Sequence, residues 1–383
     1  MFFDQLDVQE NVPLRDLTTF GIGGPARYYL RAGTVDEMIL GLQAAQREGV
    51  PCFILGGGSN ILVSDRGFEG LVIHVATKGI TTLAEDETSI TLRVAAGEVW
   101  DRFVATTTES GWWGVENLSL IPGSVGAFPI QNVGAYGQEA RDVVASVRVW
   151  DRQTERIASL SNADCRFGYR SSIFNTSQQG RYVILDVAIK LSKVGGANLS
   201  YRGLRDYFAE APTTPEQMRA AVIAIRERKL PHPDEIGSAG SFFKNVILDN
   251  EGFARLREHV EAHLGGDVVA KLNHFRERFA AERGIKIPTA FLIDACGLKG
   301  ASLGGAALSP EHALILTNAS GEATADEVMR LARRVRRIVY AKTGLVIHPE
   351  PTLVGFSREA LDDYLSLEAP PGDEVSWLRN DAP

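Results

Sequence analysis

The sequence has little cysteine, no excess of positive charge and no long apolar run. Its three cysteines, Cys52, Cys165 and Cys296, are widely spaced and form no C-x-x-C pair, a pattern typical of a reduced, cytosolic protein. With 40 Lys and Arg against 48 Asp and Glu, the net charge is −8, which excludes a basic nucleic-acid binder. Because nowhere do about 18 apolar residues follow one another, we expect no membrane span. The N-terminal MFFDQLDVQE lacks a basic segment before an apolar one, so we expect no export signal.

Length and composition indicate a globular protein with more than one domain. The 383 residues suggest two or three domains at roughly 150 residues each. Apolar residues make up 44% and charged residues 23%, which excludes disordered and fibrous classes. The 38 glycines make up roughly 10% of the chain, above the usual share of about 7%. Such a surplus points to tight turns or to backbone pressed against a ligand.

The first part of the chain is predicted to be an α/β unit. Residues 27–31 read as a strand, and Thr34 with Glu37 forms a capping box that opens a helix ending near Gly49. A short apolar strand at residues 51–55 then runs into the sequence GGGSN, residues 56–60.

Later parts of the chain alternate between strand-rich and helix-rich patterns. From about Gly79, alternating strands surround a glycine-rich stretch at residues 117–136, and residues 213–230 read as a helix. Two helical stretches are predicted beyond it, at residues 251–283 and 325–342. The strand-like segments AFLID and ALILTN lie between them, and LVIHPEPTLVGF reads as a last strand.

Two short glycine motifs differ in whether they could bind phosphate. GIGGPA, residues 21–26, fits a dinucleotide fingerprint formally, but a strand follows it where a helix is required, so we interpret it as a turn. GGGSN leaves a strand at its carboxyl end and can turn its N–H groups inward as an anion nest. A plain turn fits GGGSN equally well on this pattern alone.

The segment from residue 117 to 139 is the richest in chemical signal. It contains four glycines, several small residues and the polar Ser124, Gln131 and Asn132, with almost no charge. A solvated loop would carry more Asp, Lys and Glu. The segment therefore reads as backbone packed against a flat or phosphate-bearing ligand, with a buried structural loop as the alternative.

Two other catalytic classes are not supported. The nucleophile elbow G-x-S-x-G is absent around each candidate serine, which argues against a serine hydrolase. His259 and His263 are spaced i, i+4, but Val260 stands where a zincin needs Glu, so we expect a solvated helix face and no metal. The arginines of residues 330–337 are likewise interpreted as an exposed helix face.

Several long motifs resemble one enzyme family. They are SLIPGSVG and PIQNVGAYG in residues 119–137, GGGSN, CRFGYRSSIF, RERKLPHP, AGSFFKN, LIDACGLKG, GGAALS and HPEPTLVGF. In their order along the chain they resemble the UDP-N-acetylenolpyruvoylglucosamine reductases, flavoenzymes of peptidoglycan precursor synthesis on which cell shape and division depend. The resemblance spans residues 18–356. Chain length and the LSYRGL segment look like the longer subtype, which folds a tyrosine-bearing loop over the substrate.

The resemblance implies a mixed α+β and α/β architecture. A vanillyl-alcohol-oxidase-type FAD-binding fold in two parts would be followed by a C-terminal α/β substrate domain. We expect the first part at residues 1–78, joined by the C-terminal strand in residues 346–383. The second part would occupy residues 79–230 and the substrate domain residues 231–345. Residues 246–280 and the tail after Phe356 match no part of the family pattern that we can place.

The resemblance also implies a non-covalent FAD. Its pyrophosphate would lie on the first glycine-rich loop and its isoalloxazine ring against the second. The implied cofactor-binding residues are Gly56, Gly57, Gly58, Ser59, Asn60, Pro122, Gly123, Ser124, Gly126, Ala127, Ile130, Asn132, Gly134 and Ala135.

The implied reaction reduces UDP-N-acetylglucosamine enolpyruvate to UDP-N-acetylmuramate, with NADPH as co-substrate. Hydride addition at C3 of the enolpyruvyl ether builds negative charge on C2 and the carboxylate. By the motif match, Ser241 would be the general acid, and Glu350 and Arg170 would polarise the carboxylate. The substrate-contacting positions would be Tyr136, Tyr201, Arg226, Lys229, Asn245 and His312.

Two other classes of function remain open on the sequence alone. A flavin oxidase using O₂ could share the fold, although no His or Cys for covalent flavin attachment lies in residues 56–60. A non-catalytic nucleotide-sugar-binding protein would be expected to lack Ser241 or Glu350, and both are present. We expect a cytoplasmic monomer without nucleic-acid or membrane partners.

Overall fold

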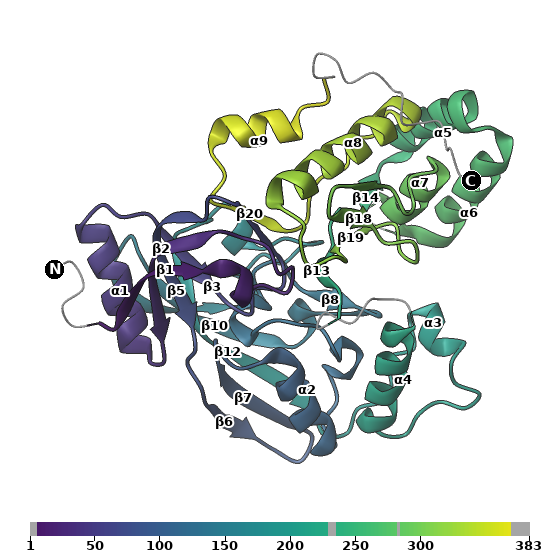
Figure 1. Cartoon of the computed structure of the whole chain (residues 1–383). Coiled ribbons are helices and arrows are strands. Elements are labelled where there is room, and N and C mark those ends of the chain that lie inside the picture. Colours follow the sequence, from purple (N-terminus) through teal and green to yellow (C-terminus); the bar gives the residue numbers. More distant parts are fainter. Residues whose placement is uncertain (1–5, 229–234, 282–283, 369–383) are drawn as a thin grey trace. The chain divides into compact units, whose positions relative to one another are not determined.

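The computed structural model describes residues 6–228, 235–281 and 284–368 (Figure 1). The chain divides into two compact units. The first comprises residues 1–239 and 352–355, and the second comprises residues 240–351 and 356–383. Since residues 1–239 form one compact unit, the predicted division near residue 78 stays a prediction.

The first sheet of the first unit has the strand order β1-β2-β5-β3. β1 pairs antiparallel with β2, whereas β5 is parallel to both β2 and β3. The strands are β1 (Val8–Pro13), β2 (Pro25–Ala32), β3 (Cys52–Leu55) and β5 (Phe68–Val75). Helix α1 (Val35–Arg47) connects β2 to β3 and begins at the predicted Thr34 and Glu37 capping box. GIGGPA enters β2 and opens no helix, which confirms that it is not a dinucleotide fingerprint.

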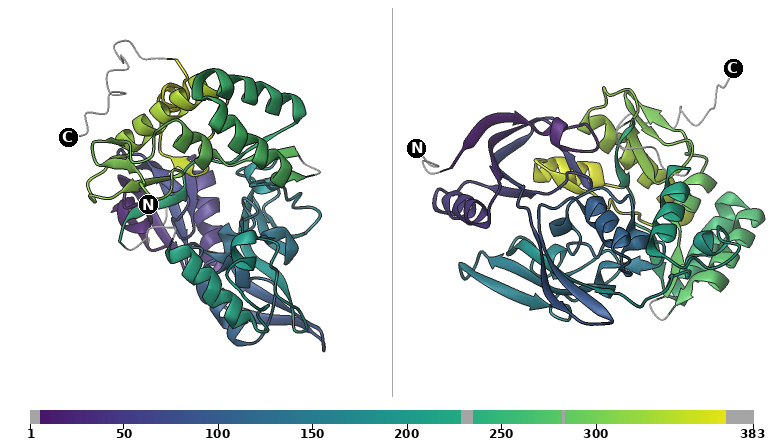
Figure 2. Two further views of the ribbon diagram at one scale, coloured as in Figure 1. Left: turned by 90° about the vertical axis from the view of Figure 1, so that its right-hand side faces the viewer. Right: turned by 90° about the horizontal axis from the view of Figure 1, so that it is seen from below.

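The second sheet of the first unit is antiparallel throughout, in the order β11-β10-β12-β7-β6. Its strands are β6 (Ile80–Glu85), β7 (Ser89–Ala95), β10 (Val144–Asp151), β11 (Arg156–Ser161) and β12 (Tyr182–Ser192). Figures 1 and 2 show the β6–β7 hairpin projecting at one edge of this sheet. One apolar core contains buried residues from both sheets, including Leu30, Ile73, Val147 and Val187.

Short helices and turns complete the first unit. They include α2 (Trp100–Glu109), α3 (Arg202–Arg205), α4 (Pro215–Glu227) and the 3₁₀ turns η2 (Glu116–Leu118) and η3 (Val125–Ala127). β8 (Gly134–Ala135) pairs with β9 (Gln138–Glu139), and β4 (Ile61–Val63) pairs in parallel with β20 (Thr352–Val354). The β4–β20 pair returns residues 352–355 to the first unit. The predicted joining of residues 346–383 to the first part stays a prediction.

The second unit contains two small sheets and five helices among its described residues. β13 (Gly237–Ser241) carries the chain into this unit, and the sheet order is β13-β19-β18-β17. Its other strands are β17 (Ser302–Leu303), β18 (Ala306–Leu308) and β19 (Ile315–Asn318). The second sheet is β14 (Val246–Leu248), β16 (Gly284–Ile287) and β15 (Ala280–Ala281). The helices are α5 (Asn250–Leu264), α6 (Gly266–Phe279), α7 (Thr289–Ala295), α8 (Ala325–Thr343) and α9 (Arg358–Leu365).

Three secondary-structure predictions for the second unit were wrong. AFLID lies within α7 and is not a strand, because Thr289, Leu292 and Ile293 are buried at the three- and four-residue spacing of a helix. Gly265, with φ of +85°, ends α5, so residues 251–283 are not one helix. In LVIHPEPTLVGF only residues 352–354 form a strand, and α9 follows it.

The arginine-rich face of α8 is not uniformly exposed, in contrast to the prediction. Arg336 is only 4% exposed. Its Nε donates to the carbonyl of Ile347 at 2.8 Å and its Nη1 donates to the carbonyl of Leu365 at 2.5 Å. Within the described part of the chain, no helix combines the length and the apolar run that crossing a bilayer requires.

Candidate active site

The first glycine-rich loop, residues 56–60, follows β3 and presents main-chain N–H groups that can donate to a ligand. No acceptor in the described ranges takes a hydrogen bond from the main-chain N–H groups of Gly57, Gly58, Ser59 or Asn60. Gly58 has φ of +64°, and a Cβ there would lie 2.0 Å from the carbonyl oxygen of Leu17. Only glycine therefore fits at residue 58, and the loop keeps uncommitted N–H donors, as an anion nest requires.

The second glycine-rich loop packs directly on the first. Ser59 Oγ donates to the carbonyl of Pro122 at 3.0 Å, and Asn60 Nδ2 donates to Gln131 Oε1 at 3.0 Å. A Cβ on Gly57 would lie 2.6 Å from Gly123 Cα. The structure thus brings the two loops predicted to hold FAD together within one unit.

The second loop is held by its own polar side chains. Asn132 is fully buried and donates to the carbonyl of Gly168 at 2.8 Å, while its Oδ1 accepts from the N–H of Arg141 at 3.0 Å. Gly126 packs against Ala96, and no side chain fits at residue 126, because its Cβ would lie 2.6 Å from Ala96 Cβ. Asn132 therefore supports the loop conformation through its side chain, and the glycines set how closely the backbone can approach a neighbour.

These residues fit a flavin dinucleotide. The uncommitted N–H groups of residues 57–60 suit a pyrophosphate. The glycines of both loops allow close approach of a flat ring. The remaining residues predicted to bind the cofactor, Ser124, Ala127, Ile130, Gly134 and Ala135, lie on the same second loop.

Three of the predicted substrate-binding residues, Tyr136, Tyr201 and Arg226, cluster at the end of the second loop in the first unit. The rings of Tyr136 and Tyr201 meet edge to face with centroids 5.1 Å apart. Burial raises the pKa of Tyr136, and burial lowers the pKa of Arg226 although a hydrogen bond to Tyr136 opposes the shift. The Nε of Arg226 is buried and has no acceptor within the described residues. The half-buried Arg226 beside Tyr136, whose ring meets that of Tyr201, offers a cationic, aromatic surface.

Arg170 has a strained backbone and a defined side-chain contact. Its φ is +50°, which is uncommon for a residue with a side chain. Its Nη2 donates to the carbonyl of Gly134 at 3.0 Å, and Asn175 Nδ2 donates to its carbonyl at 3.1 Å. Arg170 is therefore tied to the second glycine-rich loop.

In the second unit, the main chain of Phe242 joins three segments that carry predicted site residues. The Phe242 N–H donates to the carbonyl of Leu314 at 2.7 Å, two residues after His312. The Phe242 carbonyl accepts from the N–H of Glu350 at 2.8 Å. Since Ser241 directly precedes Phe242, the structure places the Ser241, His312 and Glu350 segments around one peptide.

The neighbouring residues continue this arrangement. The N–H of Lys244 donates to the carbonyl of His348 at 2.9 Å. Burial, and then the charges of Arg336 and Lys244, lowers the pKa of His348, so the surroundings disfavour a positively charged imidazole. Asn245 Oδ1 accepts from the N–H of Thr289 at 3.0 Å and is committed to the start of α7. Lys229, also predicted to bind substrate, lies outside the described residues.

A buried polar network beside the second loop was not evident from the sequence. Glu116 is 1% exposed, and its carboxylate accepts from the Gly114 N–H at 2.6 Å and from Gln138 Nε2 at 2.8 Å. Burial raises the pKa of Glu116. Asn117 Nδ2 donates to the carbonyls of Tyr136 and Asn198. The signal in the sequence was the pair Glu116 and Asn117, but their partners Tyr136, Gln138 and Asn198 are between 19 and 81 residues away.

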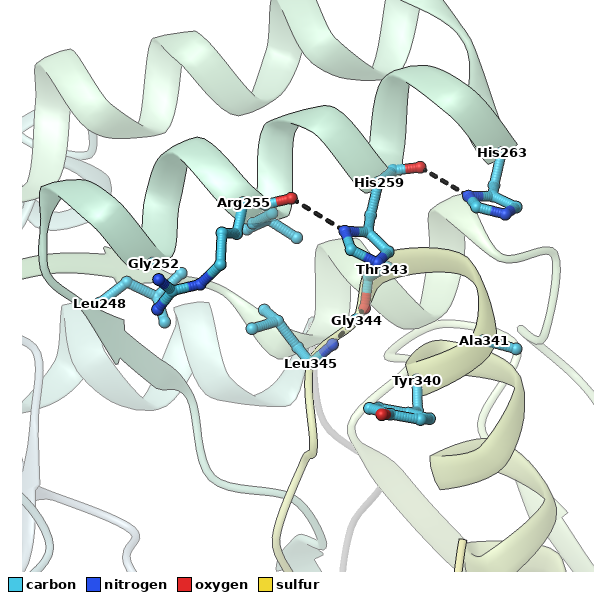
Figure 3. A pocket seen from close by; sticks show the side chains of 11 residues that line it. Leu248, Gly252, Arg255, His259, His263, Tyr340, Ala341, Thr343, Gly344 and Leu345 are labelled. Carbon is cyan, nitrogen blue, oxygen red and sulfur yellow. Dashed lines mark hydrogen bonds between the residues drawn. The ribbon is translucent and has the colours of Figure 1, made fainter. Parts of the chain in front are cut away.

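The predicted His pair lines a separate cavity in the second unit. Figure 3 shows His259 and His263 one turn apart on α5, each with Nδ1 on the main-chain carbonyl four residues earlier, at 3.1 and 2.9 Å. The cavity of about 560 Å³ lies against the C-terminal end of α8, and no predicted site residue lines it. In the part of the chain that the structure describes, no three His, Cys, Asp or Glu side chains gather around a possible metal position.

Comparison with known proteins relates both parts of the chain to one family. Residues 26–161 match the family model described as "FAD binding domain". Residues 232–354 match "UDP-N-acetylenolpyruvoylglucosamine reductase, C-terminal domain". A UDP-N-acetylenolpyruvoylglucosamine reductase of Neisseria meningitidis serogroup C is 39% identical over 350 residues, which cover 90% of this chain and 96% of the relative. One from Streptomyces coelicolor is 41% identical over 363 residues, covering 91% of each.

A solved structure supports the same fold. The UDP-N-acetylenolpyruvylglucosamine reductase of Thermus caldophilus aligns with a TM-score of 0.59 at 24% identity, covering 91% of this chain and 99% of that one. The predicted fold, an FAD-binding part followed by a C-terminal α/β domain, is therefore confirmed. The identity and the nearly complete coverage of both chains mean that this protein belongs to the UDP-N-acetylenolpyruvoylglucosamine reductase family.

Proposed function

We propose that this protein catalyses the NADPH-dependent reduction of UDP-N-acetylglucosamine enolpyruvate to UDP-N-acetylmuramate, a step of peptidoglycan precursor synthesis. The proposal follows from its membership of the family. The structural observation that carries it is the main-chain pairing of Phe242 with Glu350, because it holds the Ser241 and Glu350 motifs next to each other. FAD, held by residues 56–60 and 122–135, would supply the hydride transfer between NADPH and substrate C3.

The protein's own residues would manage the charge and the proton. Negative charge develops on C2 and the carboxylate of the substrate, so cationic and hydrogen-bonding groups are needed there. We assign Arg170 and Glu350 to polarising the carboxylate. Ser241, which is half-buried on β13, would donate the proton to C2. A hydroxyl of high pKa is a suitable acid for so basic a carbanion.

The cationic and aromatic residues would hold the nucleotide sugar. We assign substrate contacts to Tyr136, Tyr201, Arg226, Lys229, Asn245 and His312. The edge-to-face contact between Tyr136 and Tyr201 supports the tyrosine-loop subtype, in which Tyr201 covers the bound sugar. The three free cysteines support a reducing, cytoplasmic location, and we propose a monomer.

One spectroscopic experiment tests the function. The purified protein should be yellow, lose its visible absorbance with NADPH under anaerobic conditions, and regain it when the enolpyruvyl sugar nucleotide is added. Acid precipitation should release the flavin into the supernatant. Recovery of colour with O₂ but not with the substrate would contradict the proposed reductase activity and favour an oxidase. A coloured pellet would contradict non-covalent FAD.

A further inference from the structure

We propose that Asp101 is a positioning residue that links the FAD-binding loop to the substrate-side helix α4. The inference rests on the proposed function, because it concerns how two parts of that site are held relative to each other. Asp101 lies at the start of α2, and its carboxylate contacts residues from two distant segments, Leu120 and Arg219.

The first contact fixes the entry to the second glycine-rich loop. Asp101 Oδ1 accepts from the main-chain N–H of Leu120 at 2.5 Å. Leu120 has φ of +58°, so the loop adopts a turn that a side-chain-bearing residue seldom takes on its own. A strained backbone of this kind persists only where the surrounding contacts hold it.

The neighbouring Trp100 holds the same loop on both sides of Leu120. Its main-chain N–H donates to the carbonyl of Gly123 at 3.0 Å, and its Nε1 donates to the carbonyl of Leu118 at 3.0 Å. Two consecutive residues of α2 therefore bind residues 118–123 at three points. This is the stretch that leads into the residues predicted to face the flavin ring.

The second contact of Asp101 is a two-pronged ion pair with α4. Arg219 Nη1 and Nη2 donate to the two carboxylate oxygens at 2.6 and 2.8 Å. The side chains are only 18% and 27% exposed, so this pair is less screened by water than a surface pair. Burial opposes the charge on Asp101, but the hydrogen bonds from Arg219 and Leu120 outweigh it and hold the pKa below its ordinary value.

Helix α4 connects the Asp101–Arg219 ion pair to the residues assigned to substrate binding. Arg226 lies seven residues after Arg219 and so on the same face of α4. Arg226 contacts Tyr136, whose ring meets that of Tyr201. The apolar residues of α4 pack with Leu204 and Trp113, while Tyr136 lies at the edge of this cluster. The Asp101–Arg219 pair therefore sets where α4 and Arg226 lie relative to the FAD-binding loop.

The two contacts of Asp101 can be separated by mutation. Arg219→Gln removes the link to α4 but leaves Asp101 on the Leu120 N–H. We expect FAD dissociation and the rate of absorbance loss with NADPH to stay within about twofold of wild type. KM for the enolpyruvyl sugar nucleotide should rise about tenfold, the scale of a lost charge-assisted contact. Asp101→Ala removes both contacts, so it should also weaken FAD binding about tenfold.

Conservative and control variants separate positioning from general damage. Arg219→Lys keeps the charge without the two-pronged geometry, and its KM should lie between those of wild type and Arg219→Gln. Asp101→Asn can still accept from Leu120 and should retain FAD. Arg47→Gln, at an exposed pair, should leave every readout unchanged. The thermal midpoint of each holoprotein checks that it is folded.

The outcomes distinguish the inference from the function. A wild-type protein that does not reduce the enolpyruvyl sugar would overturn the proposed function. With an active wild type, an unchanged KM in Arg219→Gln would overturn the link to α4. Equal FAD loss in Arg219→Gln and Asp101→Ala would show that the carboxylate does not act on the two segments separately.

Discussion

The main-chain N–H of Glu350 donates a 2.8 Å hydrogen bond to the carbonyl oxygen of Phe242. The next pair along, Phe243 with Pro349, forms a β-bridge, and Lys244 bonds to His348. The two segments are more than 100 residues apart in sequence and both belong to the second unit. The relative placement of the Ser241 and Glu350 motifs is therefore an internal property of that unit.

Arg336 is expected to stabilise the segment that leads to Glu350. Arg336→Leu would leave the carbonyls of Ile347 and Leu365 without their buried donor. Losing hydrogen bonds to a charged group in a buried place should lower the free energy of unfolding by about 2–4 kcal/mol. Urea denaturation would measure it.

Arg330→Leu is the matched control on the same helix. Arg330 is mostly exposed and lies 3.6 Å from Asp326, so its loss should change the free energy of unfolding by about 0.5 kcal/mol or less. If the two variants were equally stable, the buried contacts of Arg336 would contribute little.

Tyr201 is expected to act on the substrate and not on FAD reduction. Tyr201→Phe keeps the ring that meets Tyr136 but removes the hydroxyl. KM for the enolpyruvyl sugar nucleotide should rise about two- to tenfold, as for one lost hydrogen bond, with the NADPH half-reaction unchanged. Steady-state and stopped-flow kinetics would measure the two effects.

Tyr207→Phe serves as the control for Tyr201→Phe. Tyr207 is 43% exposed and contacts Phe208, so its hydroxyl should not matter to either half-reaction. Equal damage to both half-reactions in Tyr201→Phe would remove Tyr201 from the substrate site.

The sequence predicted most local structure but missed contacts between distant segments. The Thr34 and Glu37 capping box opens α1 as expected, because both partners lie within four residues. Arg336 looked like one of several exposed arginines, since its acceptors, Ile347 and Leu365, lie 11 and 29 residues further along the chain, beyond any local pattern. The apolar run in α7 is too short for periodicity to separate a helix from a strand.

The candidate site shows the same division. Glycine content and missing charge pointed to the two loops, and the structure packs those loops on each other through Ser59 and Asn60. The roles of Ser241 and Glu350 came from the family resemblance alone. Asp101 was missed because its partners Leu120 and Arg219 lie 19 and 118 residues away, beyond any local pattern.

His74 is expected to make folding stability depend on pH. Burial, and then the charges of Arg31 and Lys78, lowers the pKa of His74. Its Nδ1 lies 2.7 Å from the hydroxyl oxygen of Tyr29. A folded-state pKa below the unfolded value of about 6.5 means that this contribution is complete above that pH. It is lost as the pH falls through the folded-state pKa.

A His74→Gln variant isolates this contribution. Between about pH 7 and about pH 5, the free energy of unfolding should fall more steeply for wild type than for His74→Gln. Urea titrations at several pH values would give both slopes. His274→Gln, at an exposed position on α6, should follow wild type. Parallel curves for wild type and His74→Gln would show that His74 keeps its ordinary titration in the fold.

Ser241 is expected to matter in only one half of the reaction. Loss of visible absorbance with NADPH needs no proton at substrate C2, whereas its recovery with the enolpyruvyl sugar does. Losing a positioned general acid typically costs about 10²- to 10⁴-fold, and a serine that also orients the developing charge should lie toward the upper end. Ser241→Ala should therefore lose absorbance with NADPH at nearly the wild-type rate and recover it at least about 10³-fold more slowly.

Two further variants identify the proton donor. Ser241→Cys should recover part of the rate, because a thiol can still donate a proton. Ser238→Ala is the control, since Ser238 lies three residues earlier on the same strand and is bound through its main chain to Thr19. The pairing of Phe242 with Glu350 makes that carboxyl group the alternative donor. Rapid anaerobic recovery in Ser241→Ala, abolished by adding Glu350→Gln, would transfer the role of general acid from Ser241 to Glu350.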